Sequence, residues 1–142
     1  MSKFIMLDSG PLGRLAKKDP RPDILEWCDQ VVRSGRELII PEIADYEIRR
    51  NLICERKLHS LQILDGLKRV LIYQPITTKT MLRAAELWAD ARQRGKSTAD
   101  PKELDGDVIL AAQALEADAI VATENTGHMS RYVDAKLWSL LG

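Results

Sequence analysis

Short apolar runs alternate along the chain with longer segments in which apolar residues recur at helical spacing. The strand-like runs lie at about 3–7, 37–40, 70–73, 119–122 and 136–140. A run of four to eight apolar residues is typical of a buried strand, whereas a repeat of three to four residues is typical of an amphipathic helix. Strands and helices that alternate in this way predict an α/β protein. We expect a three-layer α/β/α sandwich with a mostly parallel sheet of about five strands.

Glycine and proline residues mark the expected helix ends. Helices are predicted at about 23–34, 41–55, 57–69 and 78–94, where the first stops before Gly35 and the last before Gly95. Ser9 is the expected cap of a further helix after the first strand. The stretch from residue 95 to residue 104 is expected to be the longest loop, and it leads directly into Asp105.

The 142 residues favour a single domain over 1–142. No apolar run approaches the ~20 residues of a membrane span, and Met-Ser-Lys leads straight into the first strand, so we expect neither a membrane segment nor a secretory signal. Cys28 and Cys54 both lie in helical patterns, which favours two buried thiols in a reducing, cytoplasmic compartment.

Positive and negative side chains balance, with 21 Lys plus Arg against 21 Asp plus Glu. The chain therefore lacks the strong basic field of a protein that holds long nucleic acid. Balance does not exclude a local basic patch, because it says nothing about how the charges are distributed. A chain near zero net charge also tends to associate.

Acid or amide residues stand at the ends of the predicted strands or near the starts of the helices that follow. They are Asp8 after the first run, Glu47 after the second, Asp107 at the start of a helix, and Glu124 and Asn125 after the fourth run. In an α/β sheet these positions converge on one crevice. Carboxylates gathered there repel one another unless a cation lies between them, so the pattern predicts a site for Mg²⁺ or Mn²⁺.

Three of these acids have ordinary structural alternatives. Asp8 could serve as a helix cap or turn residue. Glu47 points with apolar neighbours, yet it could pair with Arg49 or Arg50 along the surface. Asp107 could be a first-turn acid that complements the helix dipole.

The residues around Asp107 and after the fourth run leave further options open. Asp107 shares its helix face with two alanines that allow a close approach to the sheet. Asp105 could be the N-cap of that helix or a second acid of the site. Thr123 or Asn125 could orient a carboxylate or a bound water, whereas Glu124 could be exposed.

Four segments carry a similarity to a known family. They are Met6-Leu-Asp8-Ser9 with Leu12, Ala44-Asp-Tyr-Glu47-Ile48, Asp107-Val-Ile-Leu-Ala-Ala112 with Ala114, and Thr123-Glu-Asn125 followed by His128-Met129. Together, in this order over residues 6–129, they resemble the PIN-domain ribonucleases, particularly the toxins of bacterial VapBC-type toxin–antitoxin modules. The resemblance implies a PIN-like fold in which Asp8, Glu47 and Asp107 bind the metal. The family's fourth position falls at Asn125, which carries no charge, and Asp105 could compensate for it.

The resemblance also implies an activity. It implies an endoribonuclease that uses Mg²⁺ or Mn²⁺ to hydrolyse RNA phosphodiester bonds and leaves 5′-phosphate and 3′-hydroxyl ends. Ser9 and Thr123 would hold the ligands in position. Cations that could steer RNA are Arg14, Arg49, Arg50 and Lys96, although the alternative for each is an ordinary solvated surface charge.

The implied partners are an RNA substrate, an antitoxin protein and a second copy of the chain. The candidate dimer contact is the helical region 41–69, whose apolar residues lie on several sides. Two rivals remain. One is a non-catalytic PIN-like module that binds RNA or protein. The other is a phosphatase or receiver-like domain that uses Asp8, although such phosphatases carry a second acid where this chain has Gly10.

Overall fold

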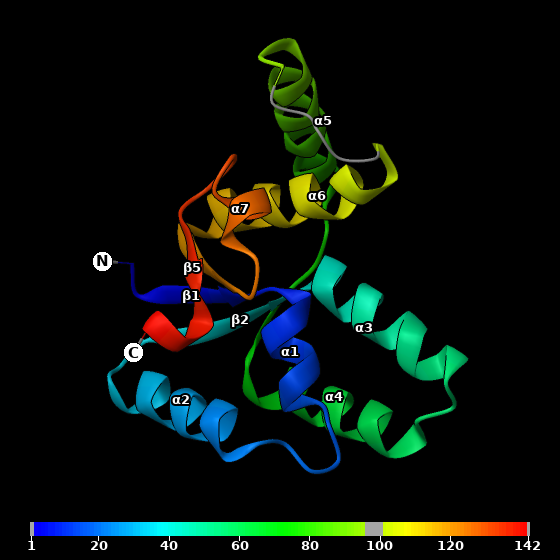
Figure 1. Ribbon diagram of the computed structural model, residues 1–142, viewed down its shortest axis with the longest axis vertical. Coiled ribbons are helices and arrows are strands. Elements are labelled where there is room, and N and C mark those ends of the chain that lie inside the picture. The colour runs from blue at the N-terminus through cyan, green and yellow to red at the C-terminus, as the bar shows by residue number, and fades with distance from the viewer. Residues whose placement is uncertain (1, 96–100, 142) are drawn as a thin grey trace.

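A parallel sheet forms the centre of the protein (Figure 1). The computed structural model describes residues 2–95 and 101–141, without the side chains of residues 101–104 and 128. Its strands are β1 (Phe4–Leu7), β2 (Glu37–Pro41), β3 (Ile72–Gln74), β4 (Ala119–Thr123) and β5 (Ala135–Leu137). In the described residues the order is β3-β2-β1-β4-β5, and every pairing is parallel.

Helices cover both faces of this sheet. They are α1 (Ser9–Leu15), α2 (Pro22–Arg33), α3 (Glu42–Cys54), α4 (Leu58–Val70), α5 (Thr78–Gln93), α6 (Pro101–Ala117) and α7 (Thr126–Met129), and a 3-10 helix, Trp138–Leu140, follows β5. In Figure 1, α1, α2 and α4 lie on one side of the sheet, and α6 and α7 lie on the other. The predicted three-layer α/β/α sandwich is confirmed.

The central strand explains why the first apolar run is continuous rather than alternating. β1 pairs with β2 on one side and with β4 on the other. Its residues Ile5, Met6 and Leu7 are fully buried. Because helices cover both faces, side chains that point in either direction are removed from water. The same strand delivers Asp8 to the carboxyl edge of the sheet.

Several predicted boundaries were wrong, each for a local reason. The cap of α1 is Asp8 rather than Ser9, since the Asp8 side chain accepts a hydrogen bond from the Ser9 N–H. The fifth strand ends at Leu137, and the chain then turns into a 3-10 helix. α6 begins at Pro101, a residue suited to the first turn of a helix, so the described end of the predicted loop is helical. Residues 96–100 of that loop lie outside the described residues.

The two cysteines differ in exposure. Cys28 in α2 is half-buried, whereas Cys54 is exposed. The expectation of two buried thiols was therefore wrong for Cys54. It is the last residue of α3, where the helix leaves the core and its side chain meets water.

Helix α5 extends away from the sheet and packs against α6 (Figure 1). Its start is closed by a capping box, in which the side chains of Thr77 and Thr80 each accept a hydrogen bond from the other's backbone N–H. No helix within residues 2–95 and 101–141 combines the length and the apolar composition that crossing a membrane requires.

Candidate active site

Three elements bring the predicted acids to the same edge of the sheet. Asp8 follows β1, Glu47 lies in the first half of α3, and Asp107 lies in α6. The backbone N–H of Asp8 donates a 3.0 Å hydrogen bond to the carbonyl of Ala122. The end of β1 is thereby fixed to the end of β4, the strand that delivers Thr123.

Both carboxylate oxygens of Asp8 are hydrogen-bonded. Oδ1 accepts from the Ser9 N–H at 2.7 Å, and Oδ2 accepts from the Thr123 hydroxyl at 2.7 Å. The Thr123 oxygen in turn accepts from the Asn125 N–H at 3.1 Å. Asp8 is therefore a helix cap and a fixed acid of the site at once, and Thr123 is the residue that orients it.

Glu47 is half-buried, and its surroundings disfavour its charged form. Burial raises the pKa of the Glu47 carboxyl, and the negative charges of Asp8 and Asp107 raise this pKa further, while Arg50 opposes them. Glu47 therefore lies within electrostatic range of both Asp8 and Asp107. Arg49 does not serve as the partner of Glu47, because it is held by other acids.

The Glu47 carboxylate packs against Gly106 of α6. A methyl group added at Gly106 would lie 3.1 Å from Glu47 Oε2, closer than ordinary van der Waals contact. The absence of a side chain at Gly106 thus lets the Glu47 carboxylate reach the turn of α6 that carries Asp107. Sequence reasoning missed this role, although a glycine between two aspartates inside a helix was the available signal.

Asp107 lies half-buried on α6, whose inner face packs closely on the sheet. Leu110, Ala111 and Ala114 on this helix are buried. Burial and the negative charge of Asp107 both raise the pKa of Tyr132. Asp107 therefore faces a region shared by Glu47 and Tyr132 rather than open solvent.

Asp105 faces a different part of the molecule. It is exposed and lines an open groove of about 360 Å³ with Trp88 of α5 and Val108 of α6. The N-cap interpretation of Asp105 was wrong, because α6 begins at Pro101. Residues two apart on a helix point roughly 200° from each other, so Asp105 and Asp107 project in nearly opposite directions.

Two acids or amides after β4 lie at the rim of the site. Asn125 is exposed and reaches the site through its backbone N–H. Glu124 forms an ion pair with Arg14 of α1 and leans on Gly10, where an added methyl group would lie 2.9 Å from its Cδ. This Glu124–Arg14 pair joins the β4 end to α1 and was not foreseen.

Three of the four cations considered for RNA steering have other contacts. Arg49 is bound by the buried Asp45 and by Asp65, and the Arg50 guanidinium lies 5.2 Å from the centre of the Tyr46 ring. Arg14, besides its pair with Glu124, lies 5.9 Å from the ring centre of Trp138. Lys96 lies outside the described residues.

The carboxylates suit a divalent ion in donor type and charge. Carboxylate oxygens are the ligands that Mg²⁺ prefers, and the repulsion that raises the pKa of Glu47 is one that a cation relieves. In the part of the chain that the structure describes, no three His, Cys, Asp or Glu side chains are gathered closely enough, as they stand, to hold a metal ion. The site is thus a coupled set of acids rather than a closed ligand cage.

Solved structures share this arrangement of elements over nearly the whole chain. VapBC2 from Rickettsia felis, bound to a promoter DNA fragment, has a TM-score of 0.79 at 17% identity and covers 95% of this chain and 98% of its own. DNA-bound VapBC from Salmonella typhimurium has a TM-score of 0.74 at 21% identity, with 97% and 99% covered. FitAB bound to a DNA fragment has a TM-score of 0.70 at 20% identity, with 97% of each chain covered.

The chain has the PIN-like fold. The resemblance read from four short segments is confirmed at the level of the fold. No protein-family model and no curated protein matches the chain. The PIN-like fold was therefore visible in the placement of a few residues and in the tertiary structure, but not in overall sequence similarity.

Proposed function

We propose that this protein is a divalent-metal-dependent endoribonuclease. The observation that carries the proposal is the electrostatic coupling of Asp8, Glu47 and Asp107 at the carboxyl edge of the sheet in a PIN-like fold. A carboxyl with a raised pKa, such as that of Glu47, beside other acids at one edge of a parallel sheet is typical of a catalytic centre. The proposed substrate is RNA, and the proposed cofactor is Mg²⁺ or Mn²⁺.

Each carboxylate has a distinct task in this proposal. Asp8 is fixed by Ser9 and Thr123 and presents a carboxylate of set orientation. Glu47 and Asp107 supply the remaining negative charge from two helices, and Gly106 allows them to approach. Together they would hold the metal, which when bound would neutralise charge on the scissile phosphate and promote attack by water. Asp105 is left out of this set because of the direction in which it projects.

Asn125 completes the edge without adding charge. Its N–H fixes Thr123 and so acts on Asp8 through one intermediate residue. Its side-chain amide can hold or position a water molecule, which is the role we assign to it. The proposed products carry 5′-phosphate and 3′-hydroxyl ends, as the family resemblance implies.

We further propose that the ribonuclease is the toxin of a type II toxin–antitoxin pair. The supporting observation is that the similar structures are VapBC and FitAB complexes, several of them bound to DNA. The expected partner is an antitoxin protein that covers the carboxylate edge. A second copy of the chain is also proposed as a partner, with the exposed Tyr46 and Ile53 on α3 as candidate contacts.

The decisive experiment compares Asp107→Asn with wild type on a fluorescent RNA in a Mn²⁺ titration. Asp107→Asn should fold normally and lose on the order of 100-fold or more in cleavage rate, since even residues that only support a metal ligand cost 10–100-fold. Asp118→Asn is the matched control, because this exposed acid follows the far end of the same helix. A folded Asp107→Asn protein that cleaves like wild type contradicts the proposal.

One observation favours a second candidate, a non-catalytic module that binds RNA or protein. Within the described residues the acids are not drawn together to metal-binding distance, and the fourth position is the uncharged Asn125. The same titration separates the candidates, because the module predicts RNA binding without cleavage at any Mn²⁺ concentration.

The toxin role has its own test in a bacterial host. Induced expression of the wild-type chain should arrest growth, whereas Asp107→Asn should not. Co-expression of the proposed antitoxin should restore growth. Growth arrest of equal strength by both chains would show that toxicity does not come from the carboxylate site.

A further inference from the structure

Four cations line one hollow of a protein whose formal net charge is zero. The hollow has a volume of about 520 Å³ and lies between the segment after α1 and the turn that joins α3 to α4. Its lining residues are Lys17, Lys18, Arg56, Lys57, Leu58, His59 and Ser60. All except Ser60 are exposed. The acid paired with this group is Glu55, at 2.9 Å from Lys57, and both side chains are more than half exposed, so the pair is hydrated and weak.

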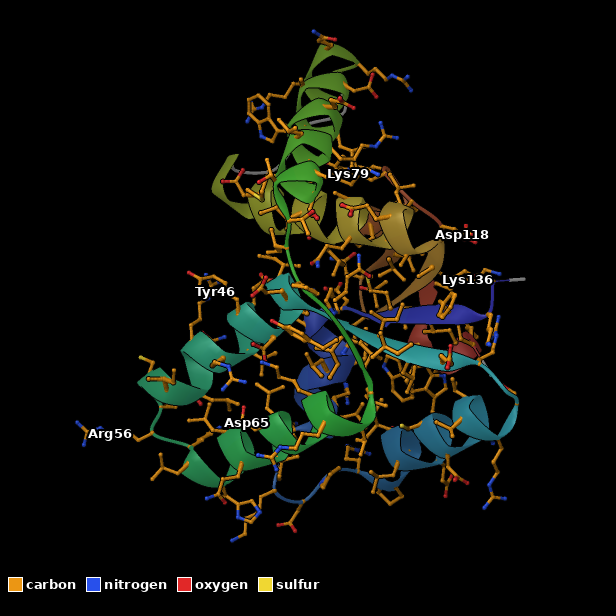
Figure 2. All side chains as sticks on the ribbon, turned by 180° about the vertical axis from the view of Figure 1, so that it is seen from behind. Tyr46, Arg56, Asp65, Lys79, Asp118 and Lys136 are labelled. Carbon is orange, nitrogen blue, oxygen red and sulfur yellow. The ribbon has the colours of Figure 1, made fainter. Side chains whose placement is uncertain are left out.

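Arg56 holds a backbone conformation that usually belongs to glycine. Its φ is 57°, and hydrogen bonds from the Arg56 N–H to Ile53 O and from the Lys57 N–H to Leu52 O close the end of α3. This is a Schellman motif with arginine where glycine is preferred, at a cost of roughly 1 kcal/mol. Figure 2 shows the Arg56 side chain pointing away from the body of the protein. A long cation is thus displayed at a strained position.

Two helices connect this hollow to the candidate active site. Lys17 lies nine residues after Asp8, and Arg56 lies nine residues after Glu47. At 1.5 Å per helical residue, each separation spans roughly 13 Å. α1 and α3 lie against each other, and a methyl group added at Gly13 would lie 3.0 Å from Ile48 Cδ1. The paired helices therefore carry acids at one end and cations at the other.

We propose that this hollow binds the phosphate backbone of the RNA strand whose cleavage the carboxylate edge performs. The identity of the ligand rests on the proposed function. Carboxylates repel a polyanion, so attraction must come from elsewhere on the surface, and lysine and arginine side chains supply it by displacing counterions. Leu58 and His59 add apolar and ring surface on which unpaired bases can lie. An RNA strand in the hollow reaches the acids within a few nucleotides.

The test measures binding without cleavage. Fluorescein-labelled single-stranded RNA is titrated into Asp107→Asn protein in EDTA, with and without Lys17→Glu/Lys18→Glu. The matched control is Lys79→Glu/Arg83→Glu on α5, which changes net charge equally; Figure 2 shows Lys79 far from Arg56. We expect the first pair to raise Kd on the order of 10-fold at about 100 mM salt and to lower the log–log salt slope by about 1.4. The control should change Kd less than about twofold.

A second variant separates binding from backbone strain. Arg56→Gly relieves the positive φ and removes the charge, so it should raise Tm while weakening RNA binding. Asp118 is the other non-glycine residue with positive φ in the described ranges, at 52°. Asp118→Gly should raise Tm and leave RNA binding intact. Unchanged RNA affinity in Arg56→Gly would overturn the proposal.

The remaining outcomes divide cleanly between this inference and the nuclease proposal. If the two charge reversals weaken RNA binding equally, binding depends on net charge alone, and the proposal that the hollow binds RNA is overturned. Binding of a polyglutamate peptide there, with no binding of RNA, would also overturn it. If wild type cleaves RNA and Lys17→Glu/Lys18→Glu binds RNA with normal affinity, RNA binding by the hollow is rejected. The nuclease proposal is then retained. If wild type does not cleave RNA but Lys17→Glu/Lys18→Glu selectively weakens RNA binding, the nuclease proposal is wrong. The hollow is then supported as an RNA-binding surface.

Discussion

The hydroxyl of Thr123 donates a 2.7 Å hydrogen bond to Asp8 Oδ2, joining the end of β4 to the start of α1. The two residues are 115 positions apart in the chain. Thr123 is almost fully buried, at 1% exposure, so water cannot replace the hydroxyl. The orientation of Asp8 therefore depends on a buried residue from a distant segment of the chain.

Replacing Thr123 by valine should reduce RNA cleavage by ~10–100-fold, because Asp8 loses the group that orients it. The free energy of unfolding should fall by ~1–2 kcal/mol, since a half-buried carboxylate oxygen loses its donor. Cleavage rates and chemical denaturation measure both effects. Thr123→Ser keeps the hydroxyl and should retain activity within a few-fold; if it is as inactive as the valine variant, the hydrogen bond is not the cause.

Glu47→Gln should stabilise the metal-free protein at pH 7. The folded-state pKa of Glu47 is raised above its ordinary 4.5, so its ionised form is less favourable folded than unfolded. This penalty is full above the folded pKa and disappears below the ordinary value, where both states are protonated. Thermal unfolding in EDTA should show a higher Tm for Glu47→Gln at pH 7 and equal Tm values near pH 3.5.

Added Mn²⁺ gives the complementary measurement. The ion should raise the Tm of wild type more than that of Glu47→Gln, because this variant has lost one of the three carboxylate charges that favour the ion. A wild-type Tm that does not respond to Mn²⁺ would count against a metal at this edge.

Gly106→Ala should separate stability from activity. Alanine favours the α6 helix by up to ~1 kcal/mol over glycine, but its methyl group would lie 3.1 Å from Glu47 Oε2 and displace that carboxylate. We expect cleavage to fall on the order of 10-fold with little loss of Tm. Gly66→Ala is the control, because an added methyl group in α4 has no heavy atom within 4 Å. It should raise Tm and leave cleavage unchanged.

The two thiols should react at different rates. Cys54 is exposed, whereas burial and then the charge of Asp29 raise the pKa of Cys28 above its ordinary 9.0. At pH 8 a thiol reagent should label Cys54 rapidly and Cys28 at least ~10-fold more slowly. Cys54→Ser should remove the fast phase; labelling in denaturant should show one thiol in this variant and two in wild type. A fast phase that survives the substitution would place the reactive thiol at Cys28.

Much of the fold could be predicted because its signals are local. Ile5, Met6 and Leu7 form an uninterrupted apolar run since β1 lies at the centre of the sheet, and helix ends such as Gly35 have a preferred chemistry. The ends of the strands and helices were harder to predict. Trp138–Leu140 is apolar like a strand, yet it forms a 3-10 turn after β5, because hydrophobicity alone does not distinguish these two conformations.

The candidate site was predictable only in part. Asp8, Glu47 and Asp107 could be grouped because the sequence pattern predicted each at a strand end or near a helix start. The expected position of Asp107 was wrong, since α6 begins at Pro101 and Asp107 is not in its first turn. Their supporting contacts could not be predicted from the sequence. Gly106 matters because it lies close to the Glu47 carboxylate, and Arg49 forms an ion pair with Asp45 rather than with Glu47. Both depend on how α3 lies against its neighbours, which no spacing within one helix reveals.

The amino-acid order by itself determined the alternation of strands and helices and which acids reach the sheet edge, because periodicity and chain direction are properties of single segments. Only the tertiary structure decided which partner holds each acid and where the cations gather. Asp8 accepts a hydrogen bond from Thr123, and Lys17 lines the same hollow as Arg56, because packing brings together side chains from segments that are distant in sequence.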